Sequence, residues 1–155
     1  MNTVPAGAPA GAGPGLVADT QVVLDWLVFR DAAAGPLLEA VRVGRLRWLA
    51  TPAMRGELQH MLHHPSLARW GHDAGRALEF FDRQTTLRPD PVMPFAPRLV
   101  CSDADDQIFI DTALAHGATW LATRDRALLK LRRKAQGHGL HIVRPGEWRD
   151  AHAPA

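Results

Sequence analysis

Residues 101–125, CSDADDQIFIDTALAHGATWLATRD, constrain the fold of this chain more than any other stretch. Three carboxylates lie within its first six residues, and apolar residues at helical spacing follow them. Gly117 ends this predicted helix, because glycine readily adopts the left-handed capping conformation. An apolar run over 118–122 then predicts a buried strand that leads to Asp125. One acidic group therefore starts a helix, and another follows a strand, at the end where open α/β sheets bind ligands.

Strand and helix patterns alternate along the rest of the chain. We expect strands over residues 16–18, 46–50, 118–122 and 140–143, and helices over about 22–30, 37–44, 51–64, 71–83, 104–117 and 127–131, with a helical turn at 145–148. Four prolines between residues 87 and 99 predict an extended connector. A second register, with a strand over 21–24 and Asp25 as its terminal acid, stays open. The alternation predicts an α/β fold, a three-layer α/β/α sandwich with a mostly parallel sheet.

Composition narrows the class of protein without naming a function. The chain has 155 residues, 46% of them hydrophobic and 22% charged, which suits a folded domain with a substantial core. The single cysteine, Cys101, excludes an intrachain disulfide and a cysteine-built zinc site, so we expect a reducing, cytoplasmic location. A net charge of +2 does not by itself indicate nucleic-acid binding, and no apolar run is long enough to cross a membrane.

Both ends of the chain differ in composition from its middle. Residues 1–15 are rich in proline, glycine and alanine and lack the basic and apolar regions of a signal peptide, so we expect a disordered tail. Residues 151–155 are expected to fray. A single domain is therefore predicted over residues 16–150.

Four acidic residues fall at comparable places in this order of elements. Asp19 follows the first predicted strand, and Asp125 follows the strand at 118–122. Glu57 lies in the helix after the second strand, and Asp106 lies in the first turn of the helix that precedes 118–122. Carboxylates held close together raise each other's pKa, and bound Mg²⁺ or Mn²⁺ relieves that repulsion. Because such a site can polarise a phosphoryl oxygen and activate water, phosphodiester hydrolysis is the chemistry that fits.

Basic residues gather beside Asp125, as Arg124, Arg126, Lys130, Arg132, Arg133 and Lys134. A run of this kind usually forms a solvated helix face, but here it adjoins the predicted acidic site. Both a surface role and contact with substrate phosphate stay open, with Arg124, Arg126 and Lys130 as the candidate substrate contacts.

Other polar and aromatic residues have ordinary structural interpretations. Asp103 and Asp105 are interpreted as a helix cap and a solvent-exposed acid rather than as ligands. Asp25 and Asp111 are interpreted as polar positions where mainly buried helices reach solvent. We also expect core positions for Trp26, Trp48 and Trp120, surface positions for His60, His63 and His64, and packing, with base stacking as the alternative, for Trp70 and Trp148.

The order and spacing of these motifs resemble those of PIN-domain nucleases. The resemblance covers about residues 16–148 and is closest to the bacterial branch assigned as toxins of toxin–antitoxin pairs. It rests on a strand followed by DTQ at 19–21, on TPAMRGEL at 51–58, on DADDQIFI at 103–110 with ALAHGA at 113–118, on LATRD at 121–125 and on HIVRPGEW at 141–148.

This resemblance implies a metal-dependent ribonuclease whose acidic quartet maps to Asp19, Glu57, Asp106 and Asp125. Thr123 matches the hydroxyl that the family places beside its last acid. Gln21 stands where the family usually has asparagine, and we expect it and Thr123 to support the metal ligands by hydrogen bonds. The family also implies an RNA substrate, a cognate antitoxin and a homodimer. A second hypothesis, motivated by Gln21 and the small net charge, is a degenerate, non-catalytic PIN domain that binds RNA or a partner protein.

Overall fold

A five-stranded parallel sheet forms the centre of the protein in a computed structural model that describes residues 13–92 and 98–149. The strands are β1 (Gly15–Ala18), β2 (Arg47–Ala50), β3 (Thr85–Leu87), β4 (Trp120–Ala122) and β5 (His141–Val143). Their order is β3-β2-β1-β4-β5, and each of the four pairings is parallel. The predicted mostly parallel sheet is therefore confirmed.

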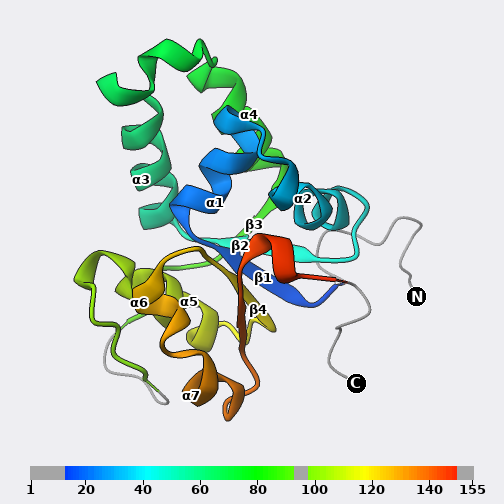
Figure 1. Ribbon diagram of the computed structural model, residues 1–155, viewed down its shortest axis with the longest axis vertical. Helices are drawn as coiled ribbons and strands as arrows, with labels where there is room; N and C mark the ends of the chain where they lie inside the picture. Colours follow the sequence, from blue (N-terminus) through cyan, green and yellow to red (C-terminus); the bar gives the residue numbers. More distant parts are fainter. Residues whose placement is uncertain (1–12, 93–97, 150–155) are drawn as a thin grey trace.

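Helices cover both faces of this sheet (Figure 1), which confirms the three-layer sandwich. One side carries α1 (Thr20–Leu24), α2 (Gly35–Arg42), α3 (Pro52–Leu62) and α4 (Ala74–Gln84), and the other carries α5 (Gln107–Ala115), α6 (Arg126–Leu129) and α7 (Arg132–Gln136). A π-helix, η1 (Asp25–Phe29), continues α1, and 3₁₀ turns lie at η2 (Ala32–Ala34), η3 (Pro65–Trp70), η4 (Ala104–Asp106) and η5 (Pro145–Glu147). None of the helices in the described part of the chain is long and apolar enough to cross a membrane.

Apolar side chains from both helical layers pack onto the strands. Trp48 of β2 makes edge-to-face contacts with Trp26 and Phe81, with ring centroids 5.1 Å apart in each case. Gly15 begins β1 at a point where a Cβ would lie 3.2 Å from Ala118 Cα, so the strands around it leave little room for a side chain. The expected core positions of Trp26, Trp48 and Trp120 are confirmed, and Trp148 is also buried.

The main error of the sequence prediction is the missing strand β3. It pairs on one side only, with β2, and its Thr-Thr-Leu sequence is half-buried or exposed, so it lacks the apolar run that marks the inner strands. The alternative strand over 21–24 is wrong, because these residues belong to α1. Gly15, the last residue of the predicted tail, belongs to β1. Residues 1–12, the end at 151–155 that we predict to fray and part of the predicted 87–99 connector lie outside the described residues.

The two strands at the middle of the sheet are the ones that lead to the predicted acids. β1 pairs with β2 on one side and with β4 on the other. Successive strands are added toward one edge of the sheet from β1 to β3 and toward the opposite edge from β4 to β5, so the strand order reverses between β1 and β4. In doubly wound sheets the carboxyl ends of the strands at such a reversal leave a crevice for ligands. The topology alone therefore brings Asp19 and Asp125 to the same crevice.

Candidate functional site

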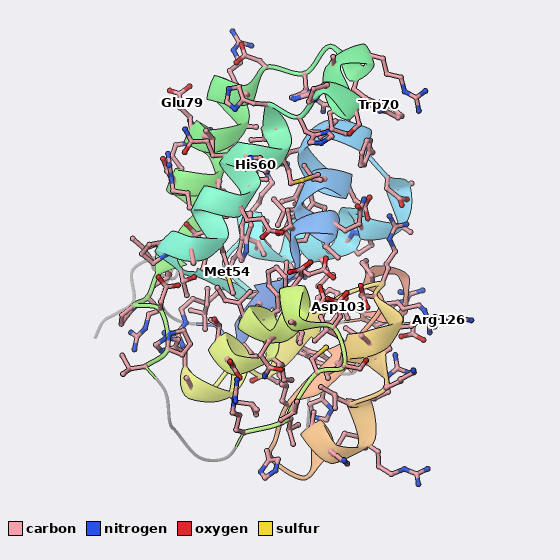
Figure 2. The ribbon with its side chains drawn as sticks, turned by 90° about the vertical axis from the view of Figure 1, so that its left-hand side faces the viewer. Met54, His60, Trp70, Glu79, Asp103 and Arg126 are labelled. Atoms are coloured by element: carbon pink, nitrogen blue, oxygen red, sulfur yellow. The ribbon has the colours of Figure 1, made fainter. Side chains whose placement is uncertain are left out.

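A cleft of about 470 Å³ opens at the carboxyl ends of β1 and β4. The four acids predicted from the sequence all line it, together with apolar and polar neighbours. Its lining residues are Asp19, Thr20, Gln21, Leu24, Glu57, Met61, Asp106, Phe109, Arg124 and Asp125. In Figure 2 the helix that carries Met54 and His60 lies above the segment around Asp103 that leads into α5. Residues of both segments, among them Glu57 and Asp106, line the cleft.

Asp19 is held rigidly at the end of β1. As the N-cap of α1, it accepts a hydrogen bond from the Val22 N–H at 2.9 Å through Oδ1, and its Oδ2 accepts one from the Thr123 hydroxyl. Its own N–H donates to the Ala122 carbonyl at 3.1 Å, which joins the ends of β1 and β4. Burial raises the pKa of this carboxyl, although the two hydrogen bonds oppose that effect. Only 4% of the residue is exposed.

Three carboxylates form the tightest acidic cluster in the described part of the chain. One oxygen each from Asp103, Asp106 and Asp125 lies within 4.8 Å of the others. Burial, a hydrogen bond with Asp125 and the negative charges of Asp125, Asp103 and Asp19 raise the pKa of Asp106 from 3.8 to about 7. The Oδ2 atom of Asp106 is buried and has no hydrogen-bond partner among the residues described. A divalent cation with oxygen ligands would satisfy this atom and remove the repulsion.

Asp103 is the residue that sequence reasoning missed as a member of this cluster. It is the helix cap that we expected, since its Oδ1 accepts from the Asp105 N–H at 2.9 Å, but it also lies beside Asp106 and Asp125. Residues three apart at the start of a helix share a face, so the Asp-x-x-Asp spacing was the available signal. Asp105 is exposed, in agreement with its predicted role.

Glu57 faces the cluster from another layer of the protein. It lies on α3, exposed, and lines the cleft without belonging to the group of three close carboxylates. Thr51 starts this helix as the N-cap by accepting from the Met54 N–H at 3.3 Å, and Pro52 occupies its first position. The chain therefore presents an acid from α3 opposite the acids of the β1 and β4 ends.

Gln21, predicted to support the metal ligands, and Arg124, predicted to contact substrate, both make contacts that we did not expect. The Gln21 amide donates to Asp25 Oδ1 at 3.3 Å, one helical turn further along the chain, and not to Asp19. Arg124 is paired with Asp25 and Asp31, at 2.9 and 3.4 Å, although it also lines the cleft. Thr123 does contact Asp19, as described above.

The two acids interpreted as solvent-reaching positions are in fact buried. Asp25 is 1% exposed and pairs with Arg124, and Asp111 is 7% exposed and lies 3.4 Å from Arg98 Nε. Asp25 is paired with an arginine 99 residues away, which the helical pattern could not reveal, and Asp111 also accepts from the Gln107 amide at 2.8 Å, one helical turn earlier. The histidines at 60, 63 and 64 are exposed, as expected. Arg126 and Lys130 are exposed as well, and Figure 2 shows Arg126 projecting outward from the body of the protein.

The fold and the cleft together define a doubly wound α/β protein with a carboxylate site at the reversal point of its sheet. A family model described as PIN domain matches residues 15–127, and the chain belongs to this family. The crystal structure of VapBC2 from Rickettsia felis bound to a DNA fragment from their promoter is similar to this protein, with a TM-score of 0.55. That similarity covers 83% of this chain and 96% of the other at 11% sequence identity, so it shows a common fold. A search of curated proteins finds no match.

Proposed function

We propose that this protein is a divalent-metal-dependent endoribonuclease that hydrolyses RNA phosphodiesters. The observation that carries the proposal is the cluster of Asp103, Asp106 and Asp125, whose oxygens lie within 4.8 Å of one another. The buried Oδ2 of Asp106 has no hydrogen-bond partner among the described residues, and a cation at the cluster would satisfy it. Membership of the PIN domain family supports nuclease chemistry at this site.

The residues present suit Mg²⁺ or Mn²⁺, which prefer carboxylate and water ligands. Asp103, Asp106 and Asp125 would hold the ion, with Asp19 and Glu57 acting directly or through water from the cleft walls. When bound, the metal would activate water and stabilise charge on the phosphate. Thr123 orients Asp19 by its hydrogen bond, and the exposed cations Arg126 and Lys130 would contact RNA phosphates.

Cleavage of labelled RNA by purified protein tests the proposal. We expect cleavage with Mn²⁺, none with EDTA, and loss of cleavage in Asp106→Asn and Asp125→Asn. Asp105→Asn is the matched control, because Asp105 is an exposed acid of the same segment that does not belong to the cluster. Equal cleavage by wild type and the cluster variants would refute the proposal. RNA binding without any response to metal would favour the second hypothesis, a non-catalytic PIN domain.

We also propose that the protein is the toxin of a toxin–antitoxin pair and acts in the cytoplasm. The similarity to VapBC2 supports a partner protein, and the homodimer is proposed from the family resemblance. A second groove, of about 610 Å³, is the site where we expect an apolar segment of the antitoxin. Trp26, Leu27 and Phe80 contribute to its apolar lining, as does Trp70, which is 45% exposed. The arginines at 30, 42 and 76 also line it, so acidic side chains on that segment would complement its charge.

A further inference from the structure

Arg124 lies at the rim of the acid-lined cleft, yet its guanidinium is directed at two carboxylates outside the candidate metal cluster. Its Nη2 donates to Asp25 Oδ1 at 2.9 Å, and its Nη1 donates to Asp31 Oδ2 at 3.4 Å. The Asp25 side chain is 2% exposed, whereas that of Arg124 is 46% exposed. A buried carboxylate that loses its cation is left uncompensated, so Arg124 is not free to exchange Asp25 for a phosphate.

The two segments that Arg124 joins are the ones that carry candidate ligands. Asp25 and Asp31 follow α1, whose N-cap is Asp19. Arg124 itself lies between Thr123, whose hydroxyl donates to Asp19, and Asp125, whose N–H donates to Thr123 Oγ1 at 2.9 Å. The ion pairs of Arg124 therefore fasten the turn after β4 to the helical segment after β1.

Gln21 strengthens the same connection from the other side. Its amide shares Asp25 Oδ1 with Arg124, at 3.3 Å, so Asp25 receives donors from α1 and from the turn after β4. Asp31 is itself fixed, because its Oδ1 accepts from the Ala33 N–H at 2.9 Å. A guanidinium can reach both carboxylates through different nitrogens, which a single ammonium group cannot reproduce in the same geometry.

We propose that Arg124 is a positioning residue of the metal centre and not a phosphate contact. By pairing with Asp25 and Asp31 it fixes the turn that carries Asp125 relative to Asp19, and so sets the arrangement of the carboxylates that receive the metal. This inference rests on the proposed metal-dependent function. It replaces the sequence-based hypothesis that Arg124 binds substrate, while Arg126 and Lys130 keep that proposed role.

The test measures metal binding and RNA binding separately. Mn²⁺ affinity is measured by calorimetry without RNA, and RNA affinity is measured in EDTA over a range of salt concentrations. We expect Arg124→Gln and Asp25→Asn each to weaken Mn²⁺ binding about 10–100-fold, as outer-shell changes do. RNA affinity in EDTA and its salt dependence should stay at wild-type values. The double variant, with both Arg124→Gln and Asp25→Asn, should bind Mn²⁺ as tightly as whichever single variant binds it less tightly. This is expected because both substitutions break the same Arg124–Asp25 ion pair.

Three further variants make the result specific. Arg55→Gln breaks a comparable surface pair, with Asp82 at 2.7 Å, and should leave Mn²⁺ binding unchanged. Arg126→Gln should reduce the salt slope of RNA binding by about 1 without weakening Mn²⁺ binding. Asp31→Asn, at a half-buried position, should give a smaller loss of Mn²⁺ affinity in the same direction, and it remains informative if Arg124→Gln fails to fold.

Three results would overturn the inference. Arg124→Gln could bind Mn²⁺ as wild type does while its RNA salt slope falls, which would make it a phosphate contact. Asp25→Asn and Asp31→Asn could both leave Mn²⁺ affinity unchanged, which would remove the ion pairs from the metal site. Wild type itself could bind no Mn²⁺, and then the proposed function fails and this inference fails with it. In the first two cases wild type still binds the metal, so only the role of Arg124 is refuted.

Discussion

Asp106→Asn should stabilise the metal-free protein at neutral pH while it abolishes metal binding. The pKa of Asp106 is raised from 3.8 to about 7, so between these values the folded state holds a proton that the unfolded state has released. Stability is therefore lost as pH rises through this window, because ionised Asp106 lies beside Asp103 and Asp125. The full difference corresponds to about 4 kcal/mol. Since Asp106 keeps some contact with solvent, screening reduces the expected effect to about 1–2 kcal/mol.

Urea denaturation in EDTA at pH 5 and pH 8 measures this effect. We expect Asp106→Asn to be more stable than wild type by about 1–2 kcal/mol at pH 8, and the difference to shrink or vanish at pH 5. The eight histidines titrate in the same range, so the informative quantity is the difference between the two proteins and not the pH dependence of either one. Asp105→Asn, outside the cluster, should show no such difference.

Mn²⁺ should reverse the order of stability. At about a hundredfold excess over its Kd, a ligand that binds only the folded state adds about 2.7 kcal/mol, which wild type should gain and Asp106→Asn should not. The reasoning is refuted if Asp106→Asn is no more stable than wild type at pH 8 in EDTA, or if the two proteins share one pH dependence. Either result would mean that repulsion among the three carboxylates does not lower the stability of the metal-free protein, so a cation would have no repulsion to relieve.

The remaining predictions concern single side chains of the site, the α3 cap and the groove. Thr123→Val removes the hydroxyl that donates to Asp19 and should weaken Mn²⁺ binding about 10–100-fold by calorimetry; an unchanged affinity would separate Asp19 from the metal site. Glu57→Gln, at an exposed position, should change the free energy of unfolding by less than about 0.5 kcal/mol but reduce Mn²⁺-dependent RNA cleavage about tenfold, and full activity would exclude Glu57 from the site. Thr51→Ala should lower unfolding stability by about 1–2 kcal/mol in urea, since α3 loses its cap, and equal stability would contradict that role. Trp70→Ala should weaken binding of the cognate antitoxin about tenfold or more in a titration while the fold is retained, whereas wild-type affinity would place the partner elsewhere.

The inner strands were predictable because burial on both sides leaves a short, continuous apolar run in the sequence. β1 and β4 have such runs and were found within one or two residues, whereas β3 pairs with one neighbour and has Thr-Thr-Leu. Helix α3 was also predictable, since Thr51-Pro52 is a local start signal. Local patterns thus sufficed where burial or a cap leaves its own signature within one segment.

The contacts inside the site could be predicted only in part. Strand-end acids were found because parallel topology brings them to one edge, but the partner of Asp25 is Arg124, 99 residues away. The spacing of apolar residues along the sequence cannot predict an ion pair between such distant residues. Asp103 was passed over because a helix cap and a metal ligand use the same carboxylate at the same position. The predicted contact of Gln21 with the metal ligands rests on the family resemblance, whereas its amide donates to Asp25.

The adjacency of β1 and β4 has a consequence for when activity can arise during synthesis. Thr123 lies 104 positions after Asp19 in the sequence, so the first acid of the cleft gains its hydroxyl partner only after residue 123 has left the ribosome. Closing such a long loop is entropically costly and comes late in folding. The proposed metal site therefore assembles only after residues 123–125 have been synthesised, and shorter nascent chains lack it.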